Sequence, residues 1–216
     1  SGDDPNTMVL SDEAMDIVHR ITNELHNARL LCPTYGATCC VVGQIEFFTL
    51  NDPNGADRIR KGYQLAPCNP TACFVAGLLD IEEQHIDASF EKFDRAVRLD
   101  GRFFHHVAEI YVNYTDRPDL ALVIAGDDIY RLSLLADILV KMNEHKDIVK
   151  QTKDRVAELL RKKCSKSDVP ASLFASLASI DQQKDIEAAI KNYRRALDLD
   201  YSQVHWRFAL ARLLAK

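Results

Sequence analysis

The chain has 216 residues, of which 47% are hydrophobic, and its formal net charge is −5. This length and composition allow a sizeable core and exclude a wholly disordered chain. Lys and Arg are mixed among Asp and Glu, which excludes a broad basic surface, so we do not expect nucleic acid as a partner.

Apolar residues recur at intervals of three and four over most of the chain, whereas the alternation typical of strands is scarce. We therefore predict an all-α fold. No apolar run reaches the roughly 18 residues that cross a bilayer, and no basic segment followed by an apolar one opens the chain, so we expect neither a membrane span nor a signal peptide. The predicted helices span residues 9–31, 36–50, 53–66, 70–83, 86–99, 102–115, 118–126, 128–142, 146–163, 169–181, 185–198 and 202–215.

The first predicted helix, 9–31, has one apolar stripe and an otherwise polar surface. A terminal unit of a helical stack needs a more polar outer side, so we predict that residues 1–35 form a helix capping the units that follow. The apolar stripe consists of Met15, Ile17, Val18, Ile21, Leu25 and Ala28.

The next helices repeat. Sliding the sequence along itself by 34 places Gly43 on Gly77, and sliding it by 100, close to three such periods, places the segment 87–100 on the segment 187–200. Small residues fall on small ones and large residues on large ones, which indicates a structural repeat. The shift of 34 also aligns Cys39 with Cys73, Ile59 with Phe93, Gly62 with Ala96 and Leu65 with Leu99.

A period of 34 divided into two short helices resembles the tetratricopeptide repeat, which has a small residue midway along the first helix and an Ala, aromatic, Ala series along the second. Gly43 and Gly77 match the small residue, and Pro67 matches the proline that ends the repeat. The resemblance implies a right-handed superhelical stack of antiparallel helix hairpins. The second-helix series is matched by Ala189, Tyr193 and Ala196, and by Ser89, Phe93 and Ala96. The departures are Cys39 and Cys73, where the family often has Trp, and Gly101 and Tyr201, which replace the closing proline.

The predicted organisation follows from the quality of the repeat. Residues 36–103 form two repeats, residues 104–168 form divergent helical repeats whose register stays open, and residues 169–216 form one repeat and the first helix of another. That last helix has no second helix to cover its apolar side, so we expect either a continuing chain or a homodimer through this end. The residues expected to be left partly bare are Trp206, Leu210, Leu213 and Leu214.

The resemblance also implies where a partner binds. In the family, the first helix of each hairpin lines the inner side of the stack, and a peptide or partner helix lies there. The Lys, Asn and Arg residues with which some relatives clamp the carboxylate tail of heat-shock chaperones are missing here, so we predict an apolar partner segment. The alternative is that some of these phenylalanines only pack between repeats. The predicted groove residues are Gln44, Phe47, Phe48, Phe74, Leu78, Ile81, Phe174 and Phe208, with Ala178 and Ala211 beside them.

Few residues suggest chemistry. Glu82 with His85, and the pair His105-His106 with Glu109, have metal-ligand spacing, but each lacks the second half of a site. Gly126, with the two aspartates after it, is interpreted as a helix end followed by a cap. No phosphate loop, dinucleotide fingerprint or nucleophile elbow occurs in the sequence, so we expect no cofactor.

The six cysteines match no disulfide or zinc framework and are interpreted as reduced thiols, which favours the cytoplasm. The sequence thus predicts a non-catalytic scaffold that binds a protein or peptide. Two alternatives stay open: the soluble repeat region of a larger bacterial membrane or envelope protein, such as a glycan polymerase or ligase, and, less favoured, a helical metalloenzyme.

Overall fold

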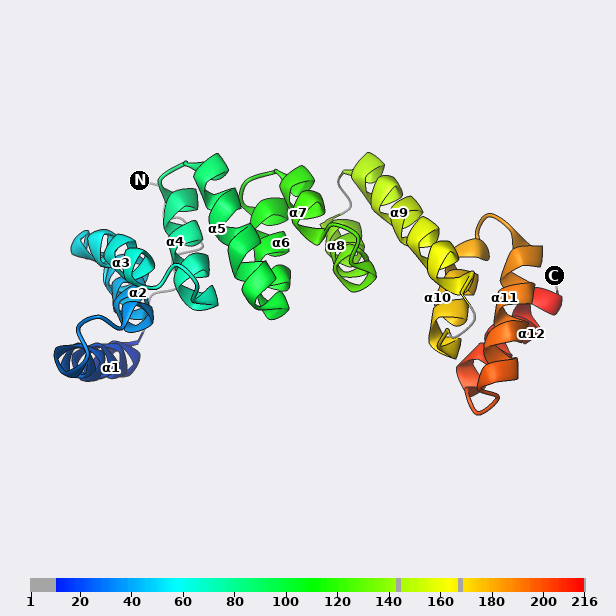
Figure 1. The fold of residues 1–216 in the computed structure, drawn as a ribbon, viewed down its shortest axis with the longest axis horizontal. Coiled ribbons are helices and arrows are strands. Elements are labelled where there is room, and N and C mark those ends of the chain that lie inside the picture. Colours follow the sequence, from blue (N-terminus) through cyan, green and yellow to red (C-terminus); the bar gives the residue numbers. More distant parts are fainter. Residues whose placement is uncertain (1–10, 143–144, 167–168, 216) are drawn as a thin grey trace. The chain divides into compact units, whose positions relative to one another are not determined.

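The computed structural model describes residues 11–142, 145–166 and 169–215, and over these residues it contains helices and no strand (Figure 1). The prediction of an all-α fold is confirmed. The chain divides into two compact units, one ending at Phe103 and the other beginning at Phe104. Residues 1–10, including the predicted start of the first helix, and Lys216 lie outside the described residues.

Over residues 11–103 the first unit contains five α-helices and two short helical turns, and consecutive helices pack as hairpins, α2 with α3 and α4 with α5. The second hairpin packs on the first through α4, and α1 packs against α2. The elements are α1 (Asp12–Leu31), α2 (Gly36–Gln44), the π-helical turn η1 (Ile45–Thr49), α3 (Asn54–Leu65), α4 (Pro70–Glu82), α5 (Ile86–Leu99) and the 3-10 turn η2 (Gly101–Phe103).

The described part of the second unit contains seven helices, and here too the hairpins follow the chain, α6 with α7, α8 with α9 and α10 with α11. The helix α12 packs on α11 as a single helix. The elements are α6 (Phe104–Asn113), α7 (Pro118–Ala125), α8 (Ile129–Met142), α9 (Lys146–Cys164), α10 (Ala171–Asp181), α11 (Ile186–Leu199) and α12 (Val204–Leu214).

Local sequence explains where these helices begin and end. The Asn69 side chain accepts a hydrogen bond from the backbone N–H of Ala72 at 3.0 Å, and Pro70 follows at the first position of α4. Asp185 caps α11 in the same way. Gly126, with a φ of 56°, ends α7 in a conformation that favours glycine, so the interpretation of this position as a helix end is confirmed.

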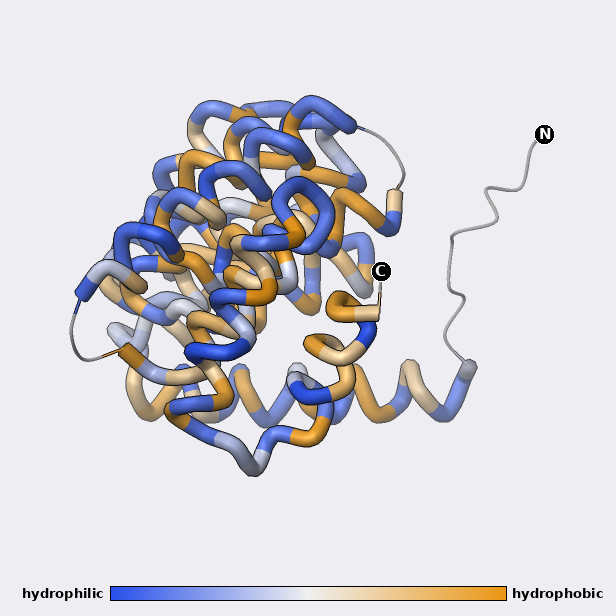
Figure 2. Tube along the Cα trace, turned by 90° about the vertical axis from the view of Figure 1, so that its right-hand side faces the viewer, coloured by the Kyte–Doolittle hydropathy of each residue, from blue (hydrophilic) through white to orange (hydrophobic). Residues whose placement is uncertain are grey.

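The aligned glycines stand where two helices nearly touch. A Cβ atom on Gly77 would lie 2.6 Å from Cε1 of Phe93, and one on Gly43 would lie 2.6 Å from the carbonyl oxygen of Gly55. Phe93 and its counterpart Ile59 are fully buried. The pairing of small and large residues at a spacing of 34 is therefore a property of the hairpin cores. Figure 2 shows hydrophobic and hydrophilic residues alternating along the helices, as this packing requires.

In the divergent region 104–168, α6 pairs with α7 and α8 with α9, and the turn inside each pair holds a residue with positive φ. Asn51 and Gln84 adopt a left-handed backbone in the two hairpins of the first unit, and Asp116 and His145 do so between α6 and α7 and between α8 and α9. The sequence left this register open, because the residue marking each turn is not a glycine and differs every time.

Two details differ from the predictions. The predicted helix 36–50 is α-helical only to Gln44 and continues as a π-helical turn. In α1 the buried residue is Thr22, and Met15, Val18 and Leu25 of the predicted apolar stripe are half-buried. Ile17 and Ile21 are each 48% exposed, so the packing face matches the predicted stripe only in part. The Thr22 hydroxyl donates to the carbonyl oxygen of Val18 at 2.8 Å, which lets this polar side chain face the interior.

Candidate functional site

The turn η1 is the most unusual element among the described residues. A π-helical turn holds one residue more than an α-helical turn, and such insertions are rare and are often found at functional sites. The turn separates neighbouring side chains: Glu46 is buried, Phe47 is half-buried and Phe48 is 39% exposed. One turn thus sends a carboxylate inward and an aromatic side chain toward the surface.

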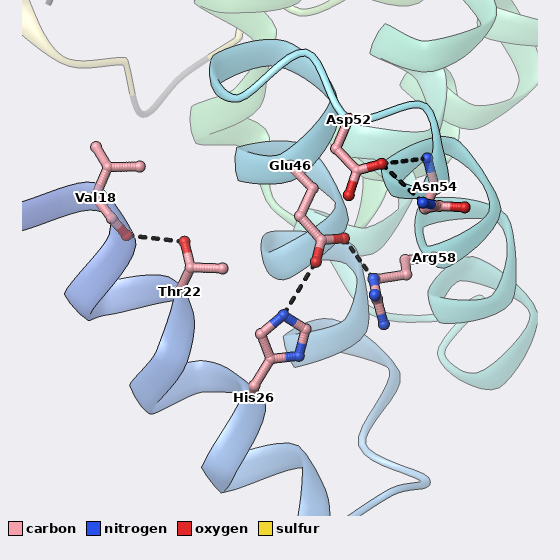
Figure 3. Close-up of polar contacts among 7 residues, drawn as sticks. All are labelled: Val18, Thr22, His26, Glu46, Asp52, Asn54 and Arg58. Atoms are coloured by element: carbon pink, nitrogen blue, oxygen red, sulfur yellow. Dashed lines mark hydrogen bonds and ion pairs between the residues drawn. The ribbon is translucent and has the colours of Figure 1, made fainter. Parts of the chain in front are cut away.

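Glu46 connects three elements of the first unit (Figure 3). Its Oε1 lies 3.0 Å from Nε2 of His26 on α1, and its Oε2 accepts a hydrogen bond from Nε of Arg58 on α3. A buried carboxylate is costly unless it is paired and hydrogen-bonded, and both of its oxygens have a partner here. The pairing anchors α1 and holds η1 in position.

The turn after η1 is also ordered by a side chain. The carboxylate of Asp52 accepts hydrogen bonds from the backbone N–H of Asn54 at 3.0 Å and from its side-chain amide at 2.9 Å (Figure 3). Asn51, directly before it, has a φ of 55°, which asparagine tolerates better than most residues. The turn between η1 and α3 is therefore fixed by the hydrogen bonds of Asp52 and by the left-handed backbone of Asn51.

Glu46 and its basic partner form a clamp, here meaning a buried carboxylate paired with a cationic side chain of a neighbouring helix. This clamp recurs with the period of the repeat. Under the shift of 34, Asp80 is the counterpart of Glu46 and Lys92 is the counterpart of Arg58. Asp80 is buried and pairs with Lys92, as Glu46 pairs with Arg58. In the second unit, Asp181 is buried and accepts from Arg161 at 2.5 Å and from the amide of a neighbouring asparagine, Asn192, at 3.1 Å.

These clamps were not predicted from the sequence. The shift of 34 aligns Glu46 with Asp80 and Arg58 with Lys92, but such charged residues look solvent-exposed in a sequence. Each clamp ties the end of the first helix of a hairpin to a neighbouring helix.

A small hollow lies beside η1. It has a volume of about 260 Å³, and its walls are Phe47, Phe48, Asn51, Pro53 and Glu82. The two phenylalanine rings meet edge to face, with centroids 5.0 Å apart and an interplanar angle of 88°. Glu82, at the end of α4, adds a carboxylate that forms no ion pair within the parts of the chain that the structure describes. Aromatic rings and a negative charge therefore share one opening.

The other predicted groove residues occupy mixed environments. Gln44, Leu78 and Ile81 are half-buried. Phe74 is half-buried between two rings of its own unit, with centroids 5.6 Å from that of Phe93 and 5.0 Å from that of Phe103. The alternative that some phenylalanines serve packing therefore applies to Phe74 at least in part.

Phe174 and Phe208 differ in their exposure to solvent. Phe174 is only 3% exposed and belongs to the core of the second unit, with the guanidinium of Arg195 4.8 Å from its ring centre. Its prediction as an open groove residue is wrong, because α11 and α12 cover it; Ala178 is buried in the same core. Phe208, on α12, is 67% exposed, and Ala211 is exposed beside it.

The end helix is partly covered. Leu213 is buried in the core that holds Phe174, while Trp206 and Leu210 are half-buried against it. The expectation that Leu213 lies bare is therefore wrong. The apolar residues that do face outward from α12 are Val204, Phe208 and Leu214.

The structure brings together the residues of one candidate metal pair but not those of the other. His105 and His106 lie 3.4 Å and 4.0 Å from Glu109 on the surface of α6. His85 gathers not with Glu82 but with Asp80 and Glu83, and these two carboxylates are already paired with Lys92 and Arg60 respectively.

The cysteines follow the repeat as predicted. Cys39 and Cys73 are buried, Cys68 is exposed, and all six thiols are free. Burial raises the pKa of the Cys40 thiol to about 12 and also raises the pKa of Cys73. Such thiols are poor nucleophiles near neutral pH, because the reactive thiolate is scarce. None of the described helices combines the length and apolar composition that a membrane span requires.

Successive hairpins, the glycine contacts at a spacing of 34 and the Ala, aromatic, Ala series at buried positions define an α-helical repeat protein whose hairpins resemble tetratricopeptide repeats.

Among solved structures, the chain is similar to YrrB, a tetratricopeptide-repeat protein with an unusual peptide-binding site, at 15% identity and a TM-score of 0.41, over 86% of this chain and 96% of that one. It is also similar to a chain of the APC/C hetero-tetramer Cut9–Hcn1, at 16% identity and a TM-score of 0.43, over 92% and 39% of the two chains. For yeast Tom70 the identity is 17%, the TM-score 0.41 and the coverage 90% and 49%. The chain thus spans less than half the length of the latter two. No protein-family model and no curated protein matches the sequence.

Proposed function

We propose that this protein is a non-catalytic scaffold that binds a peptide or helix of a protein partner at the end of its first hairpin. The observation that carries the proposal is the exposed Phe48, which a π-helical turn holds beside a small hollow. A buried ion pair braces that turn from two helices, so the aromatic side chain is presented on a rigid support. Exposed aromatic residues on rigid supports are the usual anchors of protein interfaces.

Half-buried neighbours extend this surface. Gln44 lies one helical turn before Phe48, and Leu78 and Ile81 lie on α4, which packs against the first hairpin. These side chains would contact the parts of a partner segment that flank the residue bound in the hollow. Phe208 belongs to the second unit and is not part of this surface.

The experiment places a photo-crosslinking phenylalanine analogue at position 48 and, as a matched control, at position 65. Leu65 lies on α3 of the same unit and is 41% exposed, close to the 39% of Phe48. We expect crosslinks to one partner segment from position 48 only. That segment, as a synthetic peptide, should bind the purified chain at least about tenfold more weakly after Phe48→Ala than after Leu65→Ala. Equal crosslinking from both positions, or equal losses of affinity, would contradict the proposal.

We also propose that α12 mediates self-association, because Val204, Phe208 and Leu214 are exposed on one short helix. Light scattering of the purified chain should give a mass above that of a monomer, and Phe208→Glu should reduce it. A monomeric mass that ignores this substitution would end the idea. Leu213→Glu is unsuitable as a probe, since it would place a charge in the core.

We propose a cytoplasmic location, which six free thiols favour. The alternative, a repeat region of a larger membrane or envelope protein such as a glycan polymerase or ligase, is tested by reading the gene on both sides of this sequence. Metal analysis of the purified protein tests the less favoured metalloenzyme.

A further inference from the structure

The hollow beside η1 has the size of a site for one side chain. Its volume of about 260 Å³ lies below the roughly 300–1,000 Å³ typical of pockets for small organic ligands. Two phenylalanines form its apolar part, and the Glu82 carboxylate lies at its edge. A ligand group that fits must therefore offer both a flat or apolar surface and a partner for a negative charge.

Charge around the hollow is not balanced. Three cations of α3 and α5 are paired with other carboxylates: Arg58 with Glu46, Arg60 with Glu83, and Lys92 with Asp80. Glu82 gains no cation from these groups, and the carboxylate of Asp52 is bound by the neutral amides of Asn54. Of the residues that form the walls of the hollow, Glu82 is charged and the others are neutral, so a positively charged ligand would neutralise it.

The same chain places basic side chains beside aromatic rings elsewhere. Lys92 pairs with the Asp80 carboxylate while its ammonium lies 5.6 Å from the ring centre of Tyr63. In this arrangement the chain itself supplies a cation that lies beside both an aromatic ring and a carboxylate. At the hollow, Phe47, Phe48 and Glu82 supply the ring and the carboxylate, and a partner must supply the cation.

We infer that the hollow binds an arginine side chain of the partner segment, with the guanidinium stacked on the phenylalanine rings and hydrogen-bonded to Glu82. This inference rests on the proposed function and specifies the partner chemistry. Arginine suits the site better than lysine, because its guanidinium is flat, stacks on rings and offers two parallel donors to a carboxylate. The expected partner segment is therefore apolar and carries an arginine.

The test is a titration of the full chain with short peptides, followed by amide chemical shifts. The probes are the blocked tripeptides Leu-Arg-Leu, Leu-citrulline-Leu and Leu-Glu-Leu; citrulline keeps the shape of arginine without its charge. We expect saturable shifts at Phe48, Asn51 and Glu82 with the arginine peptide. Binding should weaken at least about tenfold with citrulline or with Glu82→Gln, and little with Glu91→Gln, a matched change on the exposed side of α5.

Equal shifts from the arginine and citrulline peptides, or unchanged affinity in Glu82→Gln, would overturn the arginine inference and leave the scaffold proposal intact. If no peptide shifts the η1 amides, the arginine inference also fails, while the crosslinking experiment at position 48 still decides the proposed function. Amide spectra of Glu82→Gln without peptide check that the variant is folded.

Discussion

Substituting Gly77 with alanine tests the packing of the second hairpin most directly. The added Cβ would lie 2.6 Å from Cε1, 2.7 Å from Cδ1 and 3.1 Å from Cζ of Phe93. The ring cannot move away freely, because Phe93 is fully buried and its ring lies 5.6 Å from that of Phe74. The helices or the ring must therefore shift.

Two opposing terms set the magnitude. Alanine in place of glycine inside a helix stabilises that helix by about 1 kcal/mol. Overpacking a tight core costs about 1–3 kcal/mol, and a ring that is both buried and packed against a second ring favours the upper half of this range. We therefore expect Gly77→Ala to lower the free energy of unfolding by roughly 1–2 kcal/mol. Gly77→Leu should be worse, because it adds more atoms at the same contact.

Urea unfolding followed by circular dichroism measures the effect, and Phe93→Leu supplies a double-mutant cycle. Removing the distal ring atoms should relieve the clash, so the two substitutions together should cost less than the sum of their separate effects, by about 0.5–3 kcal/mol. Ala88→Gly, at an exposed position of α5, measures the helix-propensity term alone. Additive effects, or a Gly77→Ala variant more stable than the natural chain, would refute the close contact.

Three further predictions concern a buried clamp, the thiols and an exposed ion pair. Glu46→Gln should lower the free energy of unfolding by about 1–3 kcal/mol, toward the lower end because His26 and Arg58 are partly exposed. As a control, Asp57→Asn at an exposed ion pair should change the free energy of unfolding by less than about 0.5 kcal/mol. Equal effects of the two substitutions would argue against the clamp. A thiol reagent should label Cys32 and Cys68 promptly and Cys39, Cys40 and Cys73 slowly in the native chain, and prompt labelling of all five would contradict the repeat register. The guanidinium of Arg117 lowers the pKa of Asp119, so this pair stabilises the folded chain above the ordinary carboxyl pKa and the contribution is lost as the pH falls through the lowered value. Arg117→Gln should flatten stability over this acidic range, and an unchanged pH profile would show that the pair contributes nothing.

The repeat could be predicted from the sequence because its hairpins need particular side-chain volumes. A glycine is required where the helices nearly touch, and a large buried residue must face it, so Gly77 and Phe93 reproduce the spacing of Gly43 and Ile59. The same logic predicted the burial of Cys39 and Cys73 and the exposure of Cys68. The side-chain volume required at a close helix contact is the same in both repeats even where the residue type differs.

The candidate site was predictable only in part. Phe47 and Phe48 were singled out because they are aromatic residues on a first helix, and they do line the hollow. The π-helical turn that orients them was not predicted, because apolar periodicity does not distinguish it from a continuing α-helix. The pairing of Glu46 with His26 and Arg58, 20 and 12 residues away in the sequence, was not predicted either. Glu82 was not assigned to the hollow either, because it lies on α4 of the neighbouring hairpin and meets the two phenylalanines only in the folded chain.

The sequence by itself determined the helical class, the period of 34 and the residues at the helix contacts, because these depend on apolar periodicity and on side-chain size. Only the tertiary structure decided which aromatic residues are free to bind a partner. Phe174 and Phe208 look equivalent in the repeat, yet Phe174 is covered by α11 and α12 while Phe208 is exposed. Exposure depends on what packs against a helix from elsewhere in the chain, and the order of residues along one helix does not contain that information.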